Sequence, residues 1–97
     1  MFDRLSLMEK RYEEINNLLI DPKIISNVPE MTKLLKEQKG LEKAVFSYRE
    51  YNDIKTQIDE LEPFIHGDDE FSEMASLEMN ALEDKLSVLL EEIKILL

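Results

Sequence analysis

The sequence predicts an all-α fold, a three-helix bundle in which two long helices form an antiparallel, coiled-coil-like hairpin. Apolar residues recur at spacings of three and four over most of the chain, which places them on one side of a helix. The composition, with 35% charged residues, two glycines and three prolines, is typical of long amphipathic helices. A length of 97 residues allows one apolar core, so we expect a single helical domain spanning 1–97.

The first helix is predicted over residues 2–20, and a connector over 21–27 follows it. The apolar seam of this helix consists of Phe2, Leu5, Met8, Tyr12, Ile15 and Leu19. Asp21 and Pro22 suit the N-cap and first position of a short helical turn inside the connector. We expect Ile24 and Ile25 to dock this turn onto the core.

The second helix is predicted over residues 28–65, and Asn27 with Glu30 approximates a capping box at its start. Its apolar positions are Met31, Leu34, Leu41, Val45, Tyr48, Tyr51, Ile54, Ile58, Leu61 and Ile65. Positions 45, 48, 51 and 54 are each three apart, and such spacing rotates the apolar stripe around the helix. This helix should therefore change its main helical neighbour near Tyr48 to Tyr51. The favoured interpretation of Gly40 is a tolerated, exposed glycine, and the alternative is a close helix approach or a local weakness of the helix.

A turn at 66–68 and a third helix over 69–96 complete the fold. Gly67 can adopt the left-handed geometry that closes a helix. The negative charge that a first turn favours comes from Asp68, Asp69, Glu70 and Glu73. The predicted seam consists of Phe71, Ala75, Leu82, Leu86, Leu89, Ile93 and Leu96. Folded domains rarely end on an apolar run such as residues 95–97, so we expect this sequence to belong to a longer chain.

The residue types argue against an enzyme, and we predict no catalytic, cofactor-binding or metal site. There is no cysteine, the single histidine lies at a helix end, the two glycines are isolated, and the acidic residues lack the spacing of a calcium loop. The net charge of −10 disfavours DNA and RNA as partners. No apolar run approaches the roughly 20 residues that span a bilayer, so we expect a cytoplasmic protein.

One basic stripe stands out on this acidic chain. Lys33, Lys36, Lys39 and Lys43 fall within about 120° of one another on the second helix. The favoured interpretation is a solvated face that pairs with nearby glutamates. The alternative is a partner contact, with either an acidic protein or ribosomal RNA.

The segment 41–51, with the sequence LEKAVFSYREY, resembles the amino-terminal helical region of bacterial class I peptide chain release factors, most closely the type that reads UAA and UAG. Three further features agree in order and spacing. They are the run RYEE at 11–14, the Asp21-Pro22 connector and the acidic turn GDDE at 67–70. The likeness covers essentially the whole chain.

This resemblance implies a factor that directs hydrolysis of peptidyl-tRNA at stop codons, using a Gly-Gly-Gln loop and a Pro-x-Thr-type tripeptide. Neither motif occurs in these 97 residues. The resemblance therefore implies a non-catalytic positioning and protein-contact domain. The implied partners are the ribosome, bound through the full-length protein, the stalk-base region of the large subunit and the GTPase release factor three.

A different interpretation stays open from the residues alone. The chain would then be a stand-alone coiled-coil or spectrin-like adaptor unrelated to translation. Exposed leucines at positions 90, 96 and 97 would form its self-association seam.

Overall fold

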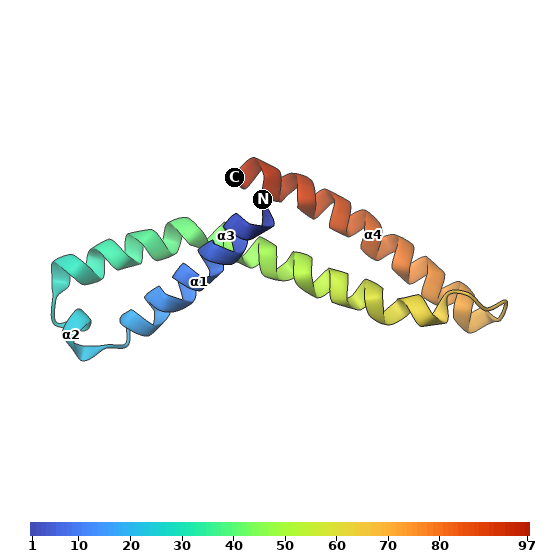
Figure 1. Ribbon diagram of the computed structural model, residues 1–97, viewed down its shortest axis with the longest axis horizontal. Helices are drawn as coiled ribbons and strands as arrows, with labels where there is room; N and C mark the ends of the chain where they lie inside the picture. The colour runs from blue at the N-terminus through green and yellow to red at the C-terminus, as the bar shows by residue number, and fades with distance from the viewer. The chain divides into compact units, whose positions relative to one another are not determined.

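The computed structural model describes residues 1–97 and contains helices and no strand (Figure 1). Its elements are α1 (Phe2–Leu18), α2 (Pro22–Ile25), α3 (Val28–Leu61), the 3₁₀ helix η1 (Glu62–Phe64) and α4 (Glu70–Leu96). The predicted all-α fold with a long antiparallel hairpin is confirmed. None of these helices combines the length and apolar character needed to cross a membrane.

The contacts within the chain group its residues into two compact units. Unit 1 comprises Met1–Phe46 with Leu96–Leu97, and unit 2 comprises Ser47–Ile95. Helix α3 runs unbroken through the boundary and contributes to both units.

Unit 1 is built from α1, α2 and the first part of α3. Its buried apolar side chains are Leu5, Tyr12, Ile15, Leu34, Ala44 and Val45. The caps lie where the sequence predicts them. Asp21 Oδ1 accepts the Lys23 backbone N–H at 2.9 Å, and Asn27 Oδ1 accepts the Glu30 backbone N–H at 3.3 Å. These bonds start α2 and α3 by satisfying backbone donors of their first turns.

Two expectations for this region need correction. Helix α1 ends at Leu18 instead of at residue 20, because the chain must turn before Asp21 takes up its extended N-cap conformation. Ile25 is 49% exposed and does not dock onto the core. A four-residue helix presents only one side inward, and the half-buried Ile24 occupies that side.

Unit 2 is the antiparallel hairpin of the second part of α3 with α4 (Figure 1). Its buried residues are Ile54, Ser72, Ala75, Met79, Leu89 and Ile93. Helix α3 ends at Leu61, four residues earlier than predicted. Pro63 lacks the backbone N–H that would continue the α-helical ladder, so the chain passes into η1.

The hairpin turn differs from the prediction at two residues. No glycine has a positive φ, so Gly67 does not provide a left-handed helix cap. Phe71 is 61% exposed, and its ring lies edge to face with Phe64 at 5.6 Å between centroids. Ser72 takes the first buried position of α4 instead, because the inward seam follows positions 72, 75, 79, 82, 86, 89 and 93.

The buried face of α3 changes along its length, as the spacing predicts. At about 100° per residue, Val45 lies roughly 20° around the helix from Leu34, whereas Ile54 lies roughly 160° away. All three side chains are at most 3% exposed. Gly40, on the same helix, is exposed and has no heavy atom within 4 Å of the position that a Cβ would occupy, so it is a tolerated glycine and not a close helix approach.

Candidate partner-contact surfaces

The four lysines of the basic stripe all lie exposed on the unit 1 part of α3. Lys36, Lys39 and Lys43 lie roughly 140° to 180° around the helix from the buried Leu34, so they are on the side of α3 away from the core. None of the four forms an ion pair within 4 Å. Lys33 acts electrostatically on Glu37. The basic stripe is therefore a row of hydrated ammonium groups on one helix.

An arginine clamp fixes the orientation of the helix that carries this stripe. Arg11 of α1 donates to Glu37 of α3 through two bonds, Nε to Oε2 at 2.6 Å and Nη2 to Oε1 at 2.9 Å. Asn16 Oδ1 accepts a bond from Gln38 Nε2 at 2.7 Å one position further along α3. The two contacts hold α1 against the inner side of α3 and leave the lysine side free.

The clamp shifts the pKa values of both partners. The hydrogen bonds from Arg11 hold the pKa of the Glu37 carboxyl below its ordinary value, and the charges of Arg11 and then Lys33 act in the same direction. Glu37 in turn raises the pKa of the Arg11 guanidinium. Arg11 Nη1 also donates to Glu14 at 2.9 Å, so one cation serves two carboxylates.

The hairpin turn places several polar groups close together. Asp69 accepts the Ser72 backbone N–H at 2.8 Å as the cap of α4, and hydrogen bonds from Ser72 lower the pKa of Asp69. His66, two residues after the end of η1, contacts Glu62 through Nε2 at 3.0 Å. Both partners in that pair are more than half exposed, so it contributes little to stability.

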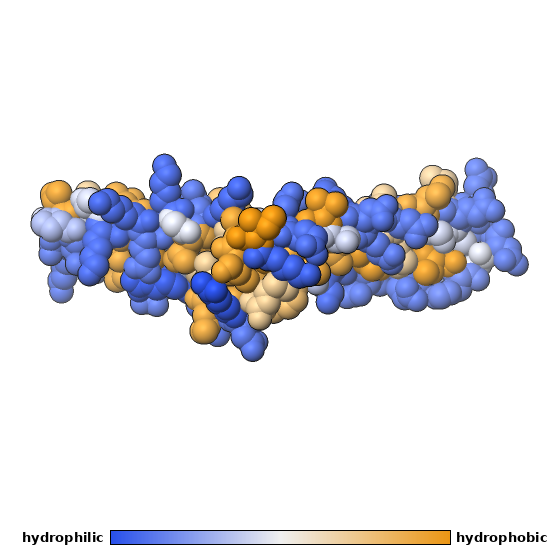
Figure 2. Space-filling view, turned by 90° about the horizontal axis from the view of Figure 1, so that it is seen from above, coloured by the Kyte–Doolittle hydropathy of each residue, from blue (hydrophilic) through white to orange (hydrophobic).

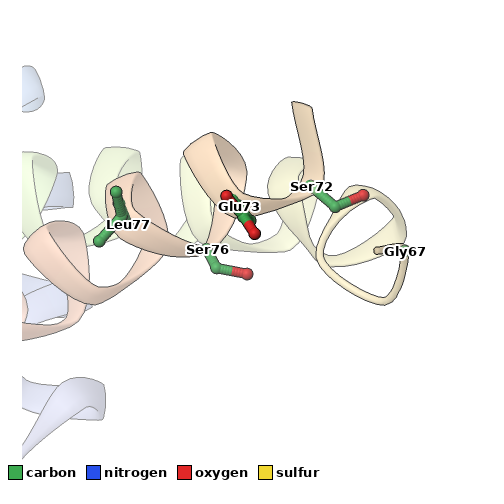
Figure 3. A pocket seen from close by; sticks show the side chains of 5 residues that line it. All are labelled: Gly67, Ser72, Glu73, Ser76 and Leu77. Carbon is green, nitrogen blue, oxygen red and sulfur yellow. The ribbon is translucent and has the colours of Figure 1, made fainter. Parts of the chain in front are cut away.

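An open hollow of about 350 Å³ lies beside this turn (Figure 3). It is lined by Gly67, Ser72, Glu73, Ser76 and Leu77. The lining offers one carboxylate and two hydroxyl groups. No group of three or more His, Cys, Asp or Glu side chains in the chain is arranged to hold a metal ion.

A second surface, on the outer side of α4, was missed by the sequence analysis. Met74, Leu77, Val88 and Ile95 are 63%, 70%, 61% and 85% exposed. On the face drawn in Figure 2, hydrophobic residues are exposed among the hydrophilic ones. The signal was present as a repeat every seven residues, at positions 74, 81, 88 and 95, but it was hidden by the stronger inward seam.

The leucines expected to form a self-association seam do not form an exposed row. Leu90, Leu96 and Leu97 are all partly buried. Leu90 is 18 positions, or five helical turns, from the buried Ser72, so it lies on the inward side of α4.

Comparison with known proteins gives a family and a set of relatives. Residues 8–97 match the model of the PCRF domain. The chain is 44% identical over 99 aligned positions to peptide chain release factor 1 of Brevibacillus brevis, 41% to that of Staphylococcus carnosus and 38%, over 100 positions, to that of Alkaliphilus oremlandii. Each alignment covers 100% of this chain and 28% of the relative. No solved structure matches the chain significantly.

The match to the family model begins at residue 8, inside α1, and extends over every later helix. The likeness to release factors found in the segment 41–51 thus holds along the whole chain. This chain belongs to the PCRF domain family.

Proposed function

We propose that this chain is the amino-terminal domain of a translation termination factor that directs hydrolysis of peptidyl-tRNA at UAA and UAG codons. The observation that carries the proposal is the identity of 38% to 44% with release factors named peptide chain release factor 1, over the full length of the chain. Since the chain spans 28% of those relatives, the codon-reading and hydrolytic parts would lie in the remainder of the protein.

Within such a factor this domain would be a non-catalytic spacer and protein-contact surface. The fold supports that role, because the buried residues are apolar apart from Ser72 and the helices pack against each other. The sequence contains neither a Gly-Gly-Gln loop nor a Pro-x-Thr tripeptide. The factor would act in the cytoplasm on the ribosome, with this domain toward the stalk base of the large subunit and within reach of the GTPase release factor three.

A chimeric factor tests the proposal. This chain replaces the matching segment of the Brevibacillus brevis release factor 1, and peptide release is measured on ribosomes stalled at UAA, UAG or a sense codon. We expect the chimera to release peptide at both stop codons and not at the sense codon. The isolated chain should release none.

The unmodified relative and a version lacking the segment serve as controls. A chimera that binds ribosomes no better than the deleted version, although its helices form by circular dichroism, would contradict the proposal. If the isolated chain then forms defined oligomers, the stand-alone adaptor is the better interpretation.

We further propose that the basic stripe contributes to ribosome binding of that factor. The support is that all four lysines are exposed on α3, three of them on the side opposite the buried Leu34, and that no ion pair neutralises them. Changing Lys33, Lys36, Lys39 and Lys43 to Gln in the chimera should raise the half-saturating factor concentration several-fold, more at low salt, and leave the maximal release rate unchanged. The matched control changes four other exposed cations, Arg4, Lys10, Lys23 and Lys55, to Gln. Equal effects of the two sets would show that only net charge matters.

A further inference from the structure

Helix α4 carries two apolar stripes where a hairpin requires one. The inward stripe, from Ser72 to Ile93, supplies the core of unit 2. The outer stripe consists of Met74, Leu77, Ala81, Val88 and Ile95, all exposed. At about 100° per residue the centres of the two stripes lie roughly 150° apart. The inward stripe alone supplies the buried residues of α4, so the hairpin leaves the outer stripe uncovered.

The exposure of these side chains is large. Met74 and Val88 are 63% and 61% exposed, and Ile95 is 85% exposed. Leu77, which is 70% exposed, also forms one wall of the hollow at the hairpin turn (Figure 3). Contiguous exposed apolar side chains on a soluble fold mark contact sites.

The spacing of the outer stripe identifies the shape of its partner. Met74, Ala81, Val88 and Ile95 recur every seven residues, so they occupy one of the two positions per heptad through which one helix packs along another. Leu77 adds the position three residues after the first of these. An amphipathic helix laid along α4 would cover the outer stripe through its own heptad positions.

The charges beside the outer stripe identify the chemistry of its partner. Glu73, Asp84 and Glu91 flank it on one side, and Glu78, Lys85 and Glu92 flank it on the other. All six are exposed, and only Glu91 forms an ion pair, with Lys94 at 3.1 Å. A helix with lysines or arginines beside its apolar row would complement these flanks. A second copy of α4 would instead bring acidic flanks together, which disfavours pairing of two copies.

We propose that the outer stripe of α4 is a docking surface for a basic amphipathic helix of a partner protein. This inference rests on the protein-contact role within the proposed function and names the surface and the partner chemistry. Its test uses no ribosomes, so loss of peptide release by the chimera and loss of helix binding are separate results.

The test uses a synthetic peptide about three heptads long, with isoleucine or leucine at the heptad positions and lysine beside them. Binding to the 97-residue chain is followed by fluorescence anisotropy at low and high salt. We expect saturable binding that salt weakens. Val88→Asn should reduce the affinity by about tenfold, because it removes one apolar side chain from the contact. Val28→Asn is the matched control, since Val28 is also 61% exposed but lies on α3, and it should leave the affinity unchanged.

A charge exchange tests the flanks. A peptide carrying glutamate in place of lysine should not bind the native chain. The double variant of the chain with Glu78→Lys and Glu92→Lys should bind this acidic peptide and no longer bind the basic one. Three results would overturn the proposal. The first is equal binding of a scrambled peptide of the same composition, and the second is an equal loss of peptide affinity with Val28→Asn. The third is sedimentation that shows a dimer of the native chain, dissociated by Val88→Asn, because a second copy would then occupy the outer stripe.

Discussion

At the scale of the residue, the contact that most specifically positions two helices is the clamp between Arg11 and Glu37. A planar guanidinium meets a carboxylate through two bonds of 2.6 and 2.9 Å, which fixes both distance and orientation. The two partners are 26 positions apart, so the clamp closes α1 onto α3. Lysine in place of Arg11 would keep the charge but lose this paired geometry.

The clamp predicts a dependence of stability on pH. Because Arg11 lowers the pKa of Glu37 in the folded chain, the ionised carboxylate stabilises the fold above the ordinary value of 4.5, and this contribution is lost as the pH falls through the lowered value. Glu37→Gln should therefore lower the melting temperature at pH 7, and the difference from the native chain should shrink below about pH 4.5. Thermal unfolding followed by circular dichroism measures this. Glu60→Gln, at an exposed position of α3, is the control, and a pH-independent difference for Glu37→Gln would contradict the argument.

At the scale of the element, helix ends are set by side chains and by proline. Asp21, Asn27 and Asp69 each cap the helix that follows them. Pro63 ends α3, and the residues after it form η1 before the chain reverses. The two glycines lie in different surroundings. Gly40 has open space where a Cβ would be, whereas Gly67 lies against Ser72.

The two glycines should therefore respond in opposite directions to alanine. Gly40→Ala should stabilise the chain by about 1 kcal/mol, because alanine restricts the unfolded backbone and favours a helix interior. Gly67→Ala should destabilise it, since the added Cβ would lie 2.5 Å from Ser72 Oγ and displace a side chain that interacts with Asp69. Urea denaturation measures both.

The double variant Gly67→Ala with Ser72→Ala separates the steric effect from a backbone effect. Removing the Ser72 hydroxyl makes room for the new Cβ, so we expect the cost of Gly67→Ala to be smaller in a Ser72→Ala background. An unchanged cost would show that the backbone of the turn, and not Ser72, requires glycine.

At the scale of the whole molecule, stability depends on a small number of buried side chains in each unit. Only Leu5, Ile15, Val45 and Ile93 are fully buried among the large residues. Three of them lie in unit 1 and one lies in unit 2. The outer surface is dominated by charge, with a formal net charge of −10. Truncating any of these few side chains should therefore remove a large share of the total free energy of unfolding.

Isoleucines in matched positions test this dependence. Ile15→Ala in unit 1 and Ile93→Ala in unit 2, both 0% exposed, should each cost about 2–5 kcal/mol, because each removes buried methyl groups and leaves a cavity. Ile20→Ala and Ile95→Ala, at 75% and 85% exposure, should change the free energy of unfolding by no more than about 0.5 kcal/mol. Amide hydrogen exchange would show whether each loss stays within its unit. Equal costs at buried and exposed positions would mean that the buried side chains do not form the stabilising core.

The sequence by itself determined the class of fold, the helix starts and the family, because these depend on local signals. Apolar spacing, capping residues and the segment 41–51 act over a few turns of helix and are visible without a neighbour. The change of buried face along α3 was also visible, as four apolar positions spaced by three. The two buried faces of α3 lie on nearly opposite sides, so the helix as a whole has little net amphipathicity, and only the local spacing revealed them.

Only the tertiary structure decided which of several apolar positions are buried and which polar side chains meet. Phe71 and Ser72 are adjacent on α4, and the packing against α3 decides that the serine is inward and the phenylalanine is exposed. Arg11 and Glu37 are far apart in sequence, so no local pattern pairs them. Periodicity shows that residues share a face of a helix, but not whether a neighbour covers that face. The outer stripe of α4 could therefore be told from a second core seam only after α3 was seen to cover the other face.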